Sequence, residues 1–297
     1  MGFLSNRIKG LTKRNSTALA PKKETIETIG ALEQALLANF PAQDAEEWDR
    51  TGLLVGDRSE HLEGVAVALD PTLSAVQSAV RAQANVLVTH HPLFIEPPSS
   101  FTPADGSQLD SGPVVWQAIN DGVAIMSFHT ALDSSILGNH MLPKMLSLEA
   151  TGLLHALPHD EAKGYGTLCA FSKREDGMTL GQLGARCLSV FGRPPRVWGD
   201  FSKKLHVVAT CNGSANSIVE ECANAGIDCL VCGELGYHHA LELAQAGIFV
   251  IELGHDVSEL PFIATLAATI EHVGVDKKRI TLLDQSTNWS CPESIRI

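Results

Sequence analysis

Short apolar runs alternate with helix-patterned segments along this chain, and the alternation occurs twice. The apolar runs are VAVAL, VLV and VAIMSF in the first half and LHVVA, CLVC and IFVIEL in the second, at residues 65–69, 86–88, 123–128, 205–209, 229–232 and 248–253. Consecutive apolar residues are typical of parallel strands that are buried on both faces. Strand–helix alternation favours parallel sheets covered by helices. The sequence therefore predicts an α/β fold with two duplicated three-layer α/β/α domains and mostly parallel sheets.

The repeat divides the chain into a first half, residues 24–150, and a second half, residues 151–297. Residues 1–23 differ from both, because they contain six Lys or Arg and no acidic residue. We predict that they form a basic flexible tail, with a short amphipathic or targeting segment as the alternative. Between 150 and 205 the signals are weaker, and we expect short strands in GYGTLCAF and RVWGDF around a helix near 180–191.

Composition limits the class of protein. With 297 residues, of which 44% are hydrophobic, the chain can bury the core of one large or two ordinary domains. A net charge of −12 argues against a broad nucleic-acid-binding face. The seven cysteines follow no secretory segment, and no apolar run approaches the length of a membrane span. We therefore expect a cytoplasmic protein with reduced thiols that binds neither membranes nor nucleic acid.

Polar side chains gather where the predicted strands end. The candidates are His90, His91, His129, Asp133, Glu234, His238, His239, His255 and Glu259. In open α/β sheets the carboxyl ends of the strands are where ligands bind. Imidazole and carboxylate are the ligands that Zn, Mn, Fe and Co prefer in proteins. A set of nine such groups predicts two metal ions, or one ion with acid–base helpers.

Each of these motifs also has a plainer interpretation. A His-His pair is common in surface turns, and Asp133 is typical of a helix or turn cap. His255 and Glu259 are spaced as an i, i+4 surface pair. His238 opens a predicted helix, where it could simply pack or hydrogen-bond. The joint occurrence of these residues at strand ends is what favours a metal site.

Five motifs occur in an order that resembles a known family. They are WDRTGLLVG, VTHHPLF, HTALD, GELGYHH and GHDVSE, beginning at residues 48, 88, 129, 233 and 254. The chain resembles the Nif-three-like family, whose members are also labelled GTP cyclohydrolase type 2 homologs. The resemblance implies two intertwined α/β/α domains with a dinuclear metal centre between them. It also implies assembly into ring-like homo-oligomers, with a hexamer as the candidate.

The resemblance also implies roles for individual residues. Asp133 would join His91 on one ion, His255 would join His90 on the other, and Glu259 would bridge both. His129 and the His238–His239 pair would lie in the surrounding shell, where His129 or His238 would act as the catalytic acid or base. Three positions depart from the family pattern: Arg50 in place of Asn, Glu234 in place of Asp, and Asp256 in place of an aromatic residue.

The resulting hypothesis is a metal-dependent hydrolase of the cyclohydrolase type. Two divalent ions would present hydroxide to a small-molecule substrate with a nucleotide-like ring. The ligand set leaves open whether the ions are Zn, Fe, Mn, Co or Ni. Two other functions stay open: a non-catalytic protein that delivers metal or mediates interactions, and a metal-dependent phosphoesterase.

Overall fold

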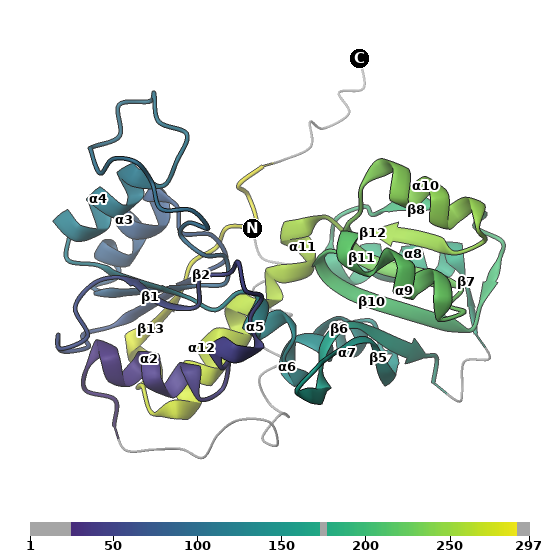
Figure 1. Ribbon diagram of the computed structural model, residues 1–297, viewed down its shortest axis with the longest axis horizontal. Coiled ribbons are helices and arrows are strands. Elements are labelled where there is room, and N and C mark those ends of the chain that lie inside the picture. Colours follow the sequence, from purple (N-terminus) through teal and green to yellow (C-terminus); the bar gives the residue numbers. More distant parts are fainter. Residues whose placement is uncertain (1–24, 173–176, 290–297) are drawn as a thin grey trace.

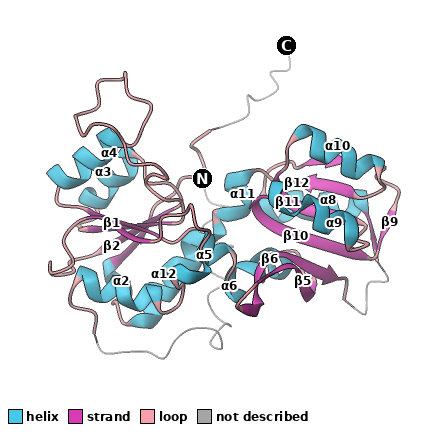
Figure 2. Cartoon of the chain, in the orientation of Figure 1, coloured by secondary structure: helices cyan, strands magenta, loops and turns pink. Residues whose placement is uncertain are grey.

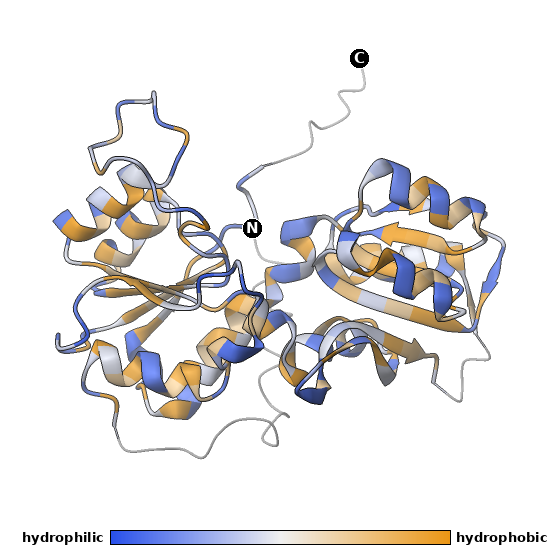
Figure 3. Ribbon diagram, in the orientation of Figure 1, coloured by the Kyte–Doolittle hydropathy of each residue, from blue (hydrophilic) through white to orange (hydrophobic). Residues whose placement is uncertain are grey.

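The computed structural model describes residues 25–172 and 177–289, and it consists of two lobes that are each built around one sheet (Figure 1). The predicted basic tail, residues 1–23, lies outside the described residues. Helices lie on both faces of each sheet (Figure 2). Hydrophobic residues are concentrated in the strands and on the inner sides of the helices (Figure 3). The predicted α/β fold class is confirmed.

The first lobe contains a five-stranded sheet in the order β1-β4-β3-β2-β13. Its strands are β1 (Gly52–Val55), β2 (Val65–Ala68), β3 (Val86–Thr89), β4 (Ala124–Ser127) and β13 (Ile280–Leu282). All neighbours run parallel except β1, which pairs antiparallel with β4. Every residue of β2, β3 and β4 is buried, which explains their unbroken apolar sequences.

Two pairs of helices cover this sheet. Helices α3 (Leu73–Arg81) and α4 (Gly112–Asn120) pack on one face. Helices α2 (Ile29–Leu37) and α12 (Pro261–Val273) pack on the other. The side chain of Thr28 caps α2 and that of Thr72 caps α3, each by accepting a hydrogen bond from a backbone N–H of the first turn.

The second lobe contains a six-stranded sheet in the order β5-β6-β10-β11-β12-β8. Its strands are β5 (Glu149–Leu157), β6 (Asp160–Ala170), β8 (Arg196–Trp198), β10 (Val207–Ser214), β11 (Cys229–Glu234) and β12 (Phe249–Glu252). The three central strands β10, β11 and β12 are parallel to one another. Strands β6 and β8 run antiparallel to them, and β5 runs antiparallel to β6. A small separate pair joins β7 (Met178–Thr179) to β9 (Lys204–Leu205).

Helices also cover both faces of the second sheet. Helix α8 (Leu180–Phe191) packs on one face. The 3₁₀ turn η3 (Asn216–Ile218), α9 (Val219–Asn224) and α10 (Tyr237–Gln245) pack on the other. Helix α8 spans the residues that the sequence predicted, because Thr179 and Gln182 form a capping box at its start.

The chain passes from one lobe to the other and back. Three short helices lead to the second lobe: α5 (Thr130–Asp133), α6 (Ile136–Asn139) and α7 (Met141–Met145). The chain returns through α11 (His255–Glu259), after which α12 lies beside α2 and β13 pairs with β2 (Figure 1). The last helix and strand therefore belong to the first lobe, and the two halves are intertwined.

A buried carboxylate ties the hairpin of the second sheet to the first lobe. Asp44, in the 3₁₀ turn η2 (Ala42–Asp44), is only 2% exposed. Its oxygens lie 2.8 Å from Nε2 of His159 and 2.6 Å from Nζ of Lys163. Burial would raise the pKa of Asp44, but these two partners hold it below its usual value. The charge pair stabilises the contact between the lobes.

All six predicted apolar runs form strands, at β2, β3, β4, β10, β11 and β12. The sequence analysis missed β1, β5, β7 and β13. Strand β5 is mostly exposed, so it carries no apolar pattern, and β13 has only three residues. The six described cysteines are free and buried, as expected for reduced thiols. The longest described helix has 13 residues, so none in this part of the chain matches the length of about 20 apolar residues that a bilayer requires.

Candidate metal centre

The five predicted metal ligands come together where the lobes meet. His90 and His91 directly follow β3, Asp133 is the last residue of α5, and α11 supplies His255 and Glu259. Together with His129, they form three groups in which the ligand atoms all lie within 4.8 Å of one another: His90–Asp133–Glu259, His91–His255–Glu259 and His90–His91–His129. Residues separated by more than 160 positions in the sequence therefore share one site.

The first group surrounds a position where a cation would fit. Nε2 of His90 lies 3.7 Å from Oδ1 of Asp133 and 3.7 Å from Oε1 of Glu259. These separations are too long for hydrogen bonds, and Nε2 of His90 and Oδ1 of Asp133 are both buried without a partner. Two ligand atoms that each lie about 2.1 Å from one tetrahedral ion are about 3.4 Å apart. The unpaired atoms therefore fit a metal ion.

The backbone determines which nitrogen of His90 can bind. Nδ1 lies 3.1 Å from the carbonyl oxygen of Phe128, and a carbonyl can only accept, so Nδ1 carries the proton. Burial lowers the pKa of His90, which favours the neutral ring. The lone pair of a neutral His90 is then on Nε2 and points toward Asp133. This is the tautomer that a metal ligand requires.

The second group is arranged around the other oxygen of Glu259. Oε2 of Glu259 lies 2.9 Å from Nε2 of His91 and 3.1 Å from Nε2 of His255. Each ring uses Nδ1 for a further carboxylate, His91 at 2.7 Å from Asp70 and His255 at 3.1 Å from Glu234. Carboxylates behind ligating imidazoles fix ring orientation and raise basicity. Because its two oxygens face different groups, Glu259 is placed to bridge two ions.

The structure pairs the ligands differently from the arrangement that the resemblance implies. Asp133 was expected beside His91 and His255 beside His90, but Asp133 lies beside His90 and His255 beside His91. The reason is the orientation of the two rings. The carbonyl of Phe128 turns Nε2 of His90 toward α5, whereas Asp70 turns Nε2 of His91 toward α11. Glu259 keeps its bridging position in both arrangements.

The acidic and basic groups of the cluster strongly shift one another's pKa values. Burial and the charge of Glu259 raise the pKa of Asp133 to about 7. Burial would raise the pKa of Glu259 as well, but the three histidines around it, His255 foremost, hold it well below its usual value. Burial disfavours charge on His91, yet hydrogen bonds with two carboxylates raise its pKa to about 10. The hydrogen bond to Glu259 raises the pKa of His255 to about 9. Protons therefore balance the buried carboxylates, and a bound divalent cation would displace them.

Two glycines allow α11 to dock this closely. At Gly213 the φ angle is +54°, and a Cβ there would lie 2.1 Å from Oε1 of Glu259. At Gly233 a Cβ would lie 2.5 Å from Oγ of Ser258. That hydroxyl accepts a hydrogen bond from the N–H of Gly213 at 2.9 Å and donates to the carbonyl of His255 at 2.8 Å. The ends of β10 and β11 therefore require glycine because the ligand-bearing helix occupies the space of a side chain.

His129 adjoins the cluster, and Asp49 holds it there. Its ring centroid lies 5.2 Å from that of His90 and 5.5 Å from that of His91. Nδ1 of His129 lies 3.2 Å from Oδ1 of Asp49, whose other oxygen accepts hydrogen bonds from the N–H and hydroxyl of Thr130. Burial opposes the charge on Asp49, but these partners lower its pKa to about 2. A charged Asp49 therefore orients the His129 ring beside the candidate ligands.

Of the three candidates in the GELGYHH motif, Glu234 reaches the cluster, whereas His238, the predicted acid or base, does not. His238 belongs to none of the three groups, is exposed on α10, and makes a ring contact with Tyr237 at 5.4 Å. His239 interacts instead with Asn216, at 3.1 Å. Glu234 is the residue of this motif that reaches the centre, through Nδ1 of His255.

Sequence reasoning included Glu234, but it missed the carboxylates behind His91 and His129. Asp70 and Asp49 orient His91 and His129, but neither was among the predicted candidates. A signal existed for both. Asp70 directly follows the apolar run VAVAL, and Asp49 belongs to the motif WDRTGLLVG.

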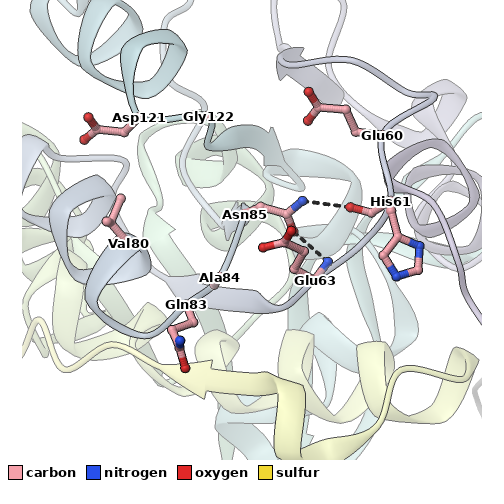
Figure 4. A pocket seen from close by; sticks show the side chains of 9 residues that line it. All are labelled: Glu60, His61, Glu63, Val80, Gln83, Ala84, Asn85, Asp121 and Gly122. Carbon is pink, nitrogen blue, oxygen red and sulfur yellow. Dashed lines mark hydrogen bonds between the residues drawn. The ribbon is translucent and has the colours of Figure 1, made fainter.

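A separate hollow lies at the amino ends of the strands of the first sheet, opposite the end that bears the candidate ligands. It is lined by residues that precede β2, β3 and β4, among them Glu63, Asn85 and Gly122 (Figure 4). The amide of Asn85 is already paired, because it accepts from the N–H of Glu63 and donates to the carbonyl of His61. Ligands of α/β sheets bind at the carboxyl ends of the strands. We assign this hollow no chemistry.

Comparisons with known proteins agree with the fold and the motifs. A family model described as Duf34/NIF3 (NGG1p interacting factor 3) matches residues 27–288. A Clostridium acetobutylicum protein named GTP cyclohydrolase 1 type 2 homolog is 29% identical over 235 residues, which cover 78% of this chain and 85% of the relative. A Streptomyces coelicolor protein of the same name is 29% identical over 246 residues, covering 80% and 84%.

Solved structures share the fold. The Staphylococcus aureus hypothetical protein SA1388 aligns with a TM-score of 0.77 at 22% identity, over 90% of this chain and 99% of that one. A Bacillus cereus protein related to NIF3 aligns with a TM-score of 0.74 at 18% identity, over 84% and 96%. At these identities the likeness concerns the fold alone.

Proposed function

The chain belongs to the Duf34/NIF3 family, as its motifs predicted, and on that premise we propose that it is a hydrolase dependent on two divalent metal ions. The observation that carries the proposal is the pair of buried, unpartnered atoms, Nε2 of His90 and Oδ1 of Asp133, which face each other across 3.7 Å. Most buried polar atoms in folded proteins have a hydrogen-bond partner, so two unpaired ligand atoms that face each other support a bound cation. Several relatives carry the name GTP cyclohydrolase 1 type 2 homolog, which supports a nucleotide-like ring as the substrate.

Each residue of the cluster has a role in this proposal. His90 and Asp133 would hold one ion, His91 and His255 would hold the other, and Glu259 would serve both groups. Two ions of this kind supply Lewis acidity and lower the pKa of water, and Zn, Fe, Mn, Co and Ni all suit the ligand set. His129, held by Asp49 through Nδ1, keeps Nε2 available to move a proton.

The number of protein ligands favours catalysis over a purely structural metal site. Each of the two ligand groups contains two residues of its own and shares Glu259. Three protein ligands leave a coordination position open, whereas structural sites are closed. A protein that only stores or delivers metal, or in which metal supports an interaction surface, remains the non-enzymatic alternative. A phosphoesterase remains the alternative reaction, since two-metal sites suit it equally.

Turnover assays separate these functions. The protein loaded with each of the five metals is incubated with GTP and with a panel of phosphoesters, and the products are identified by mass spectrometry. Ring opening of GTP, seen as the addition of water or the loss of formate, supports the cyclohydrolase reaction. Release of phosphate supports the phosphoesterase. Absence of turnover with every metal and substrate, in protein that retains its metal, contradicts a hydrolase and favours metal delivery.

The variant Glu259→Gln provides the control for these assays. It should lose turnover together with metal, because one carboxylate serves both ligand groups. Glu271→Gln, on the partly exposed side of α12, is the matched variant that should retain both.

Three further parts of the proposal follow from the family resemblance. We propose that the protein assembles into a ring-like homo-oligomer such as a hexamer, that its partner is a small molecule, and that it works in the cytoplasm. Light scattering after size-exclusion chromatography tests the assembly. A molar mass equal to one chain would contradict it.

A further inference from the structure

The segment that follows β13, residues 283–289, runs along the edge of the metal centre. It begins in the first lobe, where the N–H of Leu283 donates to the carbonyl of Val67 at 2.8 Å. Gln285, which is buried, then binds the turn after β2 through three hydrogen bonds. Its Oε1 accepts from the N–H groups of Leu69 and Asp70 at 2.8 and 2.9 Å, and its Nε2 donates to the carbonyl of Asp70 at 2.9 Å. One side chain therefore fixes the backbone of Asp70.

Asp70 carries this constraint to a candidate ligand. Its Oδ1 lies 2.7 Å from Nδ1 of His91, and its Oδ2 accepts from Nδ2 of Asn288 at 3.4 Å. Both carboxylate oxygens are therefore engaged, one with the ligand and the other with the C-terminal segment. Because Nε2 of His91 faces Glu259, the position of Asp70 decides where this nitrogen lies.

The far end of the segment is attached to the second ligand-bearing element. Nε1 of Trp289 donates to Oδ2 of Asp256 at 3.2 Å, and Arg193 donates to the same oxygen at 2.9 Å. The guanidinium of Arg193 also lies 4.0 Å from the centroid of the Trp289 ring and donates to the carbonyl of Ser286 at 3.0 Å. Asp256 is the neighbour of His255 on α11, so this cluster holds the helix that bears His255 and Glu259.

These contacts explain a departure in the sequence. Asp256 occupies a position where an aromatic residue is usual in the family that the chain resembles. Here the carboxylate accepts hydrogen bonds from both Arg193 and Trp289. A phenylalanine side chain has no oxygen that could accept either bond, so the carboxylate of Asp256 matches the presence of its two partners.

We propose that residues 283–289 form a strap that positions His91 relative to His255, and that Gln285 and Trp289 are its positioning residues. The proposal deepens the metal centre described above and rests on it. His91 follows a strand of the first lobe, whereas His255 follows β12 of the second, so their spacing depends on how the lobes are held together. The strap contacts the carboxylate behind one ligand and the residue beside the other. It thereby fixes the spacing of the two imidazoles, His91 and His255, that would hold the second ion.

Metal titration of strap variants tests the proposal. Gln285→Ala and Trp289→Ala are compared with two exposed controls of the same kinds, Gln34→Ala on α2 and Phe201→Ala in the second lobe. Co²⁺ binding is followed by absorption and calorimetry. We expect Gln285→Ala to weaken the binding of one of the two Co²⁺ ions about 10- to 100-fold, while the affinity for the other changes less than about threefold. Trp289→Ala should weaken the binding of the same ion about 3- to 10-fold. The controls should bind both ions as tightly as the parent protein.

Hydrogen exchange without metal provides a second readout that does not depend on activity. Faster exchange at residues 67–72 and 254–259 is expected in both strap variants and in neither control. If Gln285→Ala does not fold, Gln285→Glu replaces it, because a carboxylate still accepts from Leu69 and Asp70 but cannot donate to the carbonyl. Unchanged Co²⁺ affinity, or unchanged exchange at both segments, in folded strap variants overturns the proposal. A parent protein that binds two ions but shows no turnover refutes the hydrolase and leaves the strap standing.

Discussion

A single methyl group at Gly213 should disrupt the metal centre without altering any ligand. A Cβ at this position would lie 2.1 Å from Oε1 of Glu259, 3.1 Å from its Cδ and 3.4 Å from Cε1 of His255. Ordinary contact begins at 3.4 Å, so the carboxylate would have to retreat by about 1.3 Å, the difference between 3.4 and 2.1 Å. Because the side chain of Glu259 is buried and held by His91 and His255, this retreat breaks its contacts.

The expected loss can be worked out from this displacement. A misplacement of about 1 Å costs roughly 100-fold in function, and disturbing a residue that orients a ligand costs about 10- to 100-fold in metal affinity. Gly213→Ala should therefore weaken the binding of both ions by about 100-fold overall, because Glu259 serves both ligand groups. The φ angle of +54° adds about 1–2 kcal/mol of backbone strain for any residue with a Cβ.

Gly226→Ala is the matched control. Its φ angle of +67° imposes the same backbone strain, but nothing lies within 4 Å of its Cβ. Both variants should lose a similar amount of stability through the backbone, measured by urea unfolding without metal, with a further loss at position 213 from displacing Glu259. Only Gly213→Ala should lose affinity for Co²⁺ or Zn²⁺ in a calorimetric titration. If it binds both ions as tightly as Gly226→Ala does, the packing of β10 against Glu259 does not control the site.

Three further predictions concern the ligands, the catalytic base and the contact between the lobes. Glu259→Gln should reduce the bound metal, measured by elemental analysis, to less than about a tenth of the parent level, whereas Glu271→Gln should retain it. Equal metal content in the two variants would contradict the bridging role of Glu259. His129→Ala should lower turnover at least about 100-fold with metal content unchanged. His238→Ala changes an exposed residue outside the cluster and should lower turnover less than about threefold. The reverse order would assign the proton-transfer role to His238. Asp44→Asn should cost about 2 kcal/mol in the free energy of unfolding near neutral pH. Because the folded-state pKa of Asp44 is lowered, its stabilisation is present above the unfolded value of about 3.9 and is lost as pH falls through the folded pKa. The difference from the parent protein should therefore shrink in urea titrations as the pH is lowered below about 4, and a constant difference would exclude the charge as its cause.

Local sequence determined the central strands, one helix boundary and the candidate ligand set. The runs VAVAL, VLV and CLVC identify buried parallel strands because both faces of such strands are covered, so that no alternation interrupts the apolar residues. The capping box of Thr179 and Gln182 predicts where α8 begins because its hydrogen bonds are local. The histidines and carboxylates are recognisable by their places at strand ends.

Only the tertiary structure decided which distant elements pair with one another and which candidate ligands lie in the same group. Strand β13 has three residues and joins the first sheet only because α12 carries it back to β2. The pairing of His90 with Asp133, and of His91 with His255, depends on the carbonyl of Phe128 and the carboxylate of Asp70, which orient the two rings from other strands. Such orientation is a property of contacts between distant segments, and no pattern of neighbouring residues encodes it.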